Sequence, residues 1–178
     1  MKVHLACLPV LPVVLLIAAC TGPASAPTTS ENSQTTLPSA VKSDASGLPI
    51  EISHPQLYAT PDGHTHFKEV PVPLTMVASP PPGQPTAQSS VQSATTIRHS
   101  AFQPKWGIYD RDHNIFHNPT SQRFVTVRTG ELWVKASDGE TRRFQAGDVF
   151  DVLDVAPSKG HITWVGDEPV VVLYSNFE

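Results

Sequence analysis

Cysteine is scarce in this sequence, which contains only Cys7 and Cys20. Cys7 lies within an apolar run near the start of the chain, residues 5–19, and Cys20 follows that run directly. If the run is removed as a secretory signal and Cys20 is modified, no thiol remains. That excludes a disulfide, a cysteine nucleophile and a thiolate metal ligand from the folded part of the chain.

Long helical periods and basic runs are lacking as well. No apolar period lasts longer than two helical turns, and no run or face gathers lysine and arginine. The net charge is −4, so nucleic acid and anionic membrane surfaces are poor partners, and we expect no nucleic-acid binding. The sequence also contains no P-loop, dinucleotide fingerprint or nucleophile elbow, which removes the enzyme classes that depend on them.

The start of the chain has the features of a secretory signal. Lys2 precedes the apolar run, which Pro9 and Pro12 interrupt and which is shorter than the roughly 20 residues of a spanning helix. The run ends in IAAC, residues 17–20, which resembles the bacterial lipobox. The resemblance implies cleavage before Cys20 and diacylglycerol on its sulfur; the alternative is a plain secretory signal with an incidental cysteine.

The lipobox reading predicts a location. Thr21 stands where an aspartate would indicate inner-membrane retention in Gram-negative bacteria. The resemblance therefore implies a membrane partner through the lipid at Cys20, in the cell envelope, at the outer membrane if the source has one. The domain would then lie outside the cytoplasm.

Composition divides the chain into three parts. Residues 1–19 are the expected signal peptide, and residues 20–48 are rich in Pro, Ser, Thr and Ala without any aromatic residue. Such a segment buries too little apolar surface to offset its ordering entropy, so we expect a flexible tether. Residues 49–178 are expected to form one folded domain.

The expected domain is dense in short β-favouring runs and turn signals. Residues 56–72 predict a hairpin with Pro61, Asp62 and Gly63 in the turn, residues 79–90 a proline-rich loop, and residues 91–102 a strand. Two runs meet at Thr129-Gly130, which predicts a hairpin turn, and SDGE at 137–140 predicts a second tight turn. VVVLYSNF predicts a central strand covered on both faces. Turns at about 8–12-residue spacing without helices predict an all-β sandwich or barrel, and we expect a double-sheet barrel of the jelly-roll type.

The run RTGELWVKASDGETRRFQAGDVFDV, followed by His161, resembles the cupin superfamily. The matching features are a glycine after a β-run (Gly130), a tight turn, a second glycine turn (Gly147-Asp148) and a histidine on the next strand. PDGHTHF and SPPPGQP also resemble the upstream part of small single-domain cupins. The resemblance covers residues 56–178 and implies a single jelly-roll β-barrel with a small-molecule pocket at its open end.

Many cupins hold a divalent metal through two histidines and a glutamate of one motif and a histidine of a second. Carried over from Gly130, the first histidine falls on His117, the second near Pro119, the glutamate on Arg123 and the last histidine on His161. Two of the four ligands are therefore kept, and a cation replaces the carboxylate. A bound Fe, Mn, Ni or Zn ion remains an alternative, with His117 and His161 as ligands; without metal, both histidines line the pocket.

Other residues leave two interpretations open. Arg123, if it faces inward, can bind a ligand carboxylate or phosphate with two parallel hydrogen bonds; otherwise it is a surface arginine. Trp133 either forms a wall of the pocket or fills the core. His113 and Asp112 are loop residues by default and metal ligands only as an alternative, and His64 and His66 are expected to be a solvent-facing pair on a hairpin.

Three functions follow from these observations. The first is a lipid-anchored module that binds a small polar or anionic ligand through His117, Arg123, His161 and Trp133. The second is a metal-dependent oxygenase or isomerase that uses His117 and His161, with its catalytic residues otherwise unknown. The third is a non-catalytic envelope scaffold. Members of the superfamily often pair through sheet edges, so the resemblance also allows a homodimer.

Overall fold

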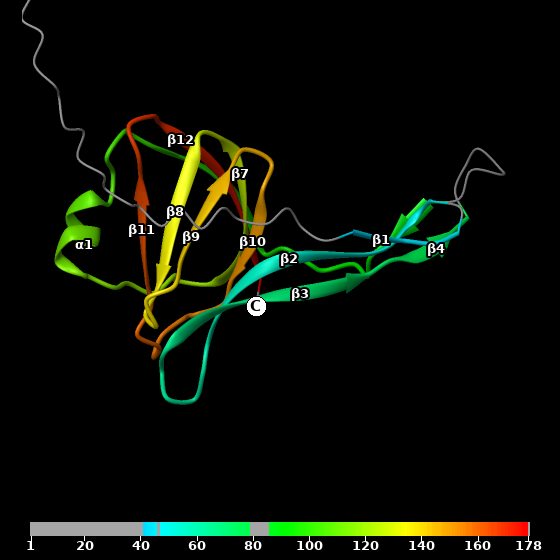
Figure 1. The fold of residues 1–178 in the computed structure, drawn as a ribbon, viewed down its shortest axis with the longest axis horizontal. Coiled ribbons are helices and arrows are strands. Elements are labelled where there is room, and N and C mark those ends of the chain that lie inside the picture. Colours follow the sequence, from blue (N-terminus) through cyan, green and yellow to red (C-terminus); the bar gives the residue numbers. More distant parts are fainter. Residues whose placement is uncertain (1–40, 46, 79–85, 178) are drawn as a thin grey trace, which may run out of the picture. The chain divides into compact units, whose positions relative to one another are not determined.

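The computed structural model describes residues 41–45, 47–78 and 86–177 of the chain, all within the unit Ser33–Glu178 (Figure 1). These residues are mostly in strands, with a single short helix among them. The all-β expectation is therefore confirmed. The expected signal peptide, Cys20 and residues 20–40 of the expected tether lie outside the described residues. No described helix has the length and apolarity needed to cross a bilayer.

The larger of the described sheets has seven strands, in the order β1-β2-β10-β7-β12-β6, with β3 also paired to β2. All neighbours are antiparallel except β10 and β2. Its strands are β1 (Val41–Ser43), β2 (Pro49–Ala59), β3 (Thr65–Pro73), β6 (Thr96–Phe102), β7 (Gln122–Thr129), β10 (Val149–Val152) and β12 (Val170–Phe177).

A smaller sheet and a hairpin complete the described strands. The smaller sheet has the order β11-β8-β9, with β8 (Glu131–Ala136), β9 (Thr141–Gln145) and β11 (His161–Val165). The hairpin pairs β4 (Thr75–Val77) with β5 (Thr86–Gln88). Residues 86–88 of the expected proline-rich loop are thus a strand, and residues 79–85 of it lie outside the described residues.

Several expected elements are present. The hairpin expected at 56–72 is β2–β3, and the tight turn at 137–140 joins β8 to β9. β6 begins at Thr96, later than expected. β1 lies inside the stretch expected to be a tether, so the sheet begins before residue 49.

The junction at Thr129-Gly130 differs from the hairpin that the sequence suggested. β7 and β8 do not pair; β7 belongs to the seven-stranded sheet and β8 to the three-stranded one. Gly130 has a φ of +71°, and a Cβ there would lie 2.5 Å from the backbone oxygen of Pro169. The glycine therefore lets the chain cross between sheets against the turn that precedes β12. Gly147 lies where the chain returns from β9 to β10, as expected.

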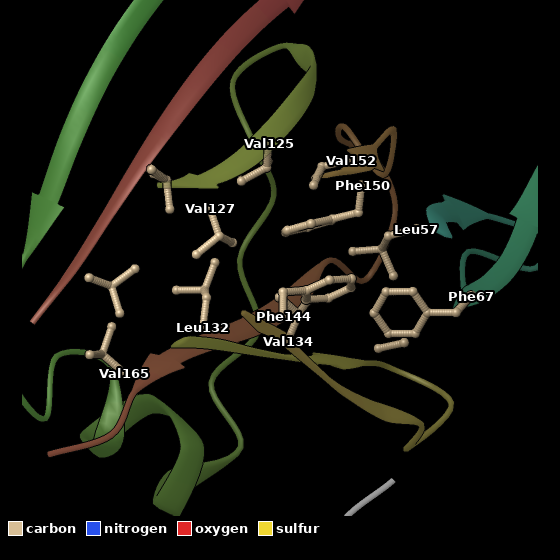
Figure 2. Packing of buried hydrophobic residues seen from close by; sticks show 13 residues of the cluster. Leu57, Phe67, Val125, Val127, Leu132, Val134, Phe144, Phe150, Val152 and Val165 are labelled. Carbon is tan, nitrogen blue, oxygen red and sulfur yellow. The ribbon is translucent and has the colours of Figure 1, made fainter. Parts of the chain in front are cut away.

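The two larger sheets pack face to face around one hydrophobic core. Figure 2 shows Val125, Phe150 and Leu57 from the seven-stranded sheet opposite Val134 and Phe144 from the three-stranded sheet. The rings of Phe144 and Phe150 stack with centroids 3.8 Å apart. Full burial of each such side chain contributes about 1.5–3 kcal/mol to the free energy of folding. The shared core therefore stabilises the packing of one sheet on the other.

Helix α1 (Ile108–His113) explains which strand is covered on both faces. Every residue of β11 is buried, because α1 packs against the outer face of this strand. β12 is central in its sheet, as expected, but most of its residues are only partly buried. The apolar run VVVLYSNF thus correctly predicted that β12 is a central strand. The prediction that both of its faces are covered is wrong.

Candidate functional site

A cavity of about 240 Å³ lies between the two packed sheets. Strands β6, β7, β10 and β12 form one side of it, and β8, β11 and residues 117–120 form the other. Its lining combines cationic and polar side chains with apolar ones. The lining residues are Arg98, Trp106, His117, Asn118, Pro119, Thr120, Arg123, Val125, Leu132, Phe150, Val152, His161, Thr163 and Tyr174.

Strand register places two arginines around Tyr174 on the inner face of the seven-stranded sheet. Tyr174 lies opposite Arg98 on one side and opposite Val125 on the other. Arg123 lies two residues before Val125, so its side chain is on the same face. The guanidinium carbons of Arg98 and Arg123 lie 5.7 Å and 5.0 Å from the centroid of the Tyr174 ring.

Neither guanidinium forms an ion pair within the described part of the chain. Arg123 donates to the backbone oxygen of Ser121 at 3.1 Å and to Thr120 Oγ1 at 3.3 Å. Burial lowers the pKa of Arg123, and burial raises the pKa of Tyr174 although both arginines oppose that rise. Tyr174 is therefore a neutral hydroxyl between two cations, and no Asp or Glu is among the described residues that line the cavity.

His117 and His161 lie side by side on the opposite wall. They form an isolated antiparallel bridge in which each backbone N–H donates to the other's oxygen at 2.9 Å. Their ring centroids are 4.7 Å apart. Burial lowers the pKa of His117, and the charges of His161 and Arg123 lower it further. The wall therefore favours a neutral imidazole at His117.

Asp154 fixes the orientation of His161. Its side chain is fully buried, and Oδ2 lies 2.8 Å from His161 Nδ1. Because an ionised carboxylate can only accept, Nδ1 carries the hydrogen of the neutral ring. Nε2 is then an unprotonated acceptor on a ring that lines the cavity. Oδ1 of Asp154 is buried without a hydrogen-bond partner among the described residues.

Two loops hold this pair in place. Asn118 Nδ2 donates to the backbone oxygen of Asp154 and to Ser158 Oγ, both at 2.7 Å. At Gly160, a Cβ would lie 2.3 Å from the backbone oxygen of His117, and φ is +78°. Only glycine allows the two chains to approach so closely. The orientation of His161 is thus supported by its surroundings rather than by its own strand alone.

The donor set does not fit a divalent metal. No group of three or more His, Cys, Asp or Glu side chains that could hold an ion occurs in the described ranges. His117 and His161 supply two metal-binding nitrogens, and Arg123 stands where a carboxylate ligand would be needed. Two guanidinium groups at the same cavity would repel a cation.

The other residues singled out from the sequence lie elsewhere. Trp133 is not among the described residues that line the cavity; it lies on the outer face of the three-stranded sheet, where its ring stacks on Trp164 with centroids 6.0 Å apart. His113 ends α1 and stacks on Tyr109. His66 pairs with Asp138, and His64 contacts Lys159. The ligand interpretation therefore keeps His117, Arg123 and His161 and loses Trp133.

Sequence reasoning missed three important residues, Arg98, Asp154 and Tyr174. A tyrosine in the otherwise apolar run VVVLYSNF was a signal, because its hydroxyl needs a polar neighbour when buried. Arg98 gave no signal, since its strand alternates only weakly. Asp154 lies in a loop, seven residues from the histidine that it contacts, and this spacing has no fixed geometry.

Comparison with known proteins adds no relative to this description. No protein-family model matches the chain, and no curated protein matches it.

Proposed function

We propose that this chain is a cell-envelope lipoprotein whose domain binds a small anionic ligand in the cavity between its two sheets. The observation that carries the proposal is the pair Arg98 and Arg123, which flank Tyr174 and have no ion pair among the described residues. Arg123 is partly buried and Arg98 is exposed. A partly buried guanidinium without a counterion is less well solvated than one in water, and an anion supplies the missing partner. A planar carboxylate or a phosphate matches the guanidinium fork.

The cavity also limits the ligand. Leu132, Phe150 and Val152 form its apolar part, and drug-sized ligands occupy pockets of roughly 300–1,000 Å³. A volume of about 240 Å³ therefore suits a small molecule with one anionic end and a short apolar body. The proposal favours this ligand class over a metal-dependent reaction, because the donor set described above does not fit a divalent ion.

The proposed architecture is a cupin-type jelly-roll barrel. It is supported by two packed antiparallel-rich sheets, by the chain crossing between them at Gly130 and Gly147, and by His117 and His161 at the cavity between them. The proposal of a lipid anchor at Cys20 rests on the IAAC sequence. Mass spectrometry of the mature N-terminus tests it: the expected result is acylated Cys20, and a free thiol or another terminus overturns it.

Binding of the anion is tested by titration calorimetry on the full mature chain and its variants. Propionate and inorganic phosphate are the probes. Arg123→Gln and Arg98→Gln are expected to weaken binding about tenfold or more, because each removes a charged hydrogen-bond donor. Arg143→Gln is the matched control. Arg143 also lies over an aromatic ring, Trp133 at 5.8 Å, but on the outer face.

The control makes the outcomes distinct. Loss of binding in the Arg98 and Arg123 variants but not in the Arg143 variant supports the proposal. Equal effects in all three variants indicate nonspecific attraction and overturn it. If neither probe binds to the wild-type protein, the domain is better described as a scaffold, and co-purification of a protein partner becomes the observation to seek.

A further inference from the structure

We propose that the ligand of this cavity is a short hydroxy acid, whose carboxylate binds Arg98 and Arg123 and whose hydroxyl donates to Nε2 of His161. The inference rests on the proposed anion binding and specifies its ligand. It depends on a different part of the site, the wall formed by His117, His161 and Asp154. The two inferences can therefore fail separately.

The first step concerns the free acceptor. Nδ1–H of His161 donates a hydrogen bond to Asp154 Oδ2, with 2.8 Å between the two atoms. In the neutral ring the lone pair of Nε2 then lies on the side away from the carboxylate. No hydrogen bond from any described residue reaches Nε2. His161 is only 6% exposed, and Nε2 is not among the fully buried unpaired atoms of the described residues, so this acceptor opens to the cavity that His161 lines. A molecule in the cavity is therefore placed to supply the donor.

The second step concerns the kind of donor. An ammonium group would satisfy Nε2, but it would enter a cavity that the guanidinium groups of Arg98 and Arg123 line, and like charges repel. A neutral donor avoids that cost. A hydroxyl is the smallest neutral group that can donate to an imidazole nitrogen, which suits a cavity of about 240 Å³.

The third step concerns how the two ends fit together. Arg98, Arg123 and Tyr174 project from the seven-stranded sheet, and His161 projects from β11 of the other sheet. Leu132 and Phe150 line the same cavity. A molecule with a carboxylate at one end, a hydroxyl near it and a short apolar body satisfies all three surfaces at once. A simple fatty acid of the same length satisfies two of them and leaves Nε2 without a donor.

The test compares acids that differ only by the hydroxyl. Lactate against propionate, and 3-hydroxybutyrate against butyrate, are titrated into the wild-type protein by calorimetry. At least one hydroxy acid is expected to bind about fivefold more tightly than its parent acid, as one added hydrogen bond predicts. Equal binding of both members in both pairs overturns the inference while leaving anion binding intact. Absence of binding by all four acids overturns this inference, and it overturns anion binding as well if inorganic phosphate also fails to bind.

Two variants separate the hydroxyl contact from the carboxylate contact. His161→Phe keeps a ring of similar size but removes the acceptor, so it is expected to retain propionate binding and lose the preference for the hydroxy acid. Asp154→Asn is expected to weaken the preference, because an amide can also donate to Nδ1 and so allows the other tautomer. Arg123→Gln is the matched contrast, expected to weaken both members of a pair by the same factor.

A spectroscopic measurement on the wild-type protein covers the case in which His161→Phe fails to fold. Nitrogen-15 shifts of the His161 ring distinguish a protonated Nδ1 from a protonated Nε2. The expected result is an unprotonated Nε2 whose shift changes with the preferred hydroxy acid and not with its parent. A protonated Nε2 in the unliganded protein contradicts the inference directly.

Discussion

The pair formed by His161 and Asp154 predicts a large loss of stability when the carboxylate is removed. Its two side chains are 8% and 0% exposed, and the Nδ1–Oδ2 distance is 2.8 Å. The chain contains a second pair for comparison. His66 Nδ1 lies 2.7 Å from Asp138 Oδ2, but these side chains are 32% and 26% exposed. The Nδ1–Oδ2 distance is therefore nearly the same in the two pairs, whereas the solvent exposure of their side chains differs.

Asp154→Ala leaves the Nδ1–H of His161 buried without an acceptor, and we expect it to lower the free energy of unfolding by about 3 kcal/mol. The exposed pair should couple by no more than about 1 kcal/mol, because water solvates either partner once the other is removed. Asp138 also accepts from the backbone N–H of Glu140 at 2.8 Å, so its single variant reports more than the ion pair. Double-mutant cycles cancel that contribution.

The assay is urea denaturation of the wild-type protein, Asp154→Ala, His161→Ala and the double variant, with the same set for Asp138 and His66. Far-ultraviolet circular dichroism is the signal, and m-values confirm that the transitions are comparable. A coupling energy that is clearly larger for the buried pair is the expected result. Equal coupling energies in the two cycles would refute the reasoning, because burial would then add nothing to the Asp154–His161 contact.

Three further predictions concern single positions. Because burial lowers the pKa of His117, the unfolded chain takes up a proton at this residue before the folded chain does, as pH falls through the ordinary value of 6.5. The free energy of unfolding should therefore fall from pH 7 to 5, and His117→Asn should reduce that fall in urea titrations. An equal fall in the variant and the wild-type protein contradicts the prediction. Gly130→Ala should lower the free energy of unfolding more than Gly139→Ala, by about 1–3 kcal/mol, since both have positive φ but only the former meets a backbone oxygen, that of Pro169; equal losses would show that the contact relaxes. Trp133→Phe should leave propionate affinity unchanged within twofold in calorimetry, because Trp133 is not among the described residues that line the cavity; a larger loss would place it at the site.

Much of the fold could be predicted because it follows from local chemistry. The turn residues Pro61, Asp62 and Gly63 and the turn at Gly139 each joined two neighbouring runs into hairpins that the structure contains. Local signals failed at Gly130, where a glycine between two β-runs has the same appearance whether the strands pair or separate into different sheets. The choice depends on which strands each run meets across the core, and that is a non-local property.

The candidate site follows the same division. The sequence alone gave His117, Arg123 and His161 as candidates, the replacement of a carboxylate by Arg123, and the choice between an inward and a surface arginine. Only the tertiary structure decided that choice, because the direction of Arg123 depends on the register of β7 against β10 and β12. It also brought Arg98 and Tyr174 to the same cavity from β6 and β12, and it placed the Asp154 carboxylate against His161. Residue types and turn signals can be recognised in the local sequence. The orientation of a side chain and the residues around it depend on strand pairing between segments far apart in the chain.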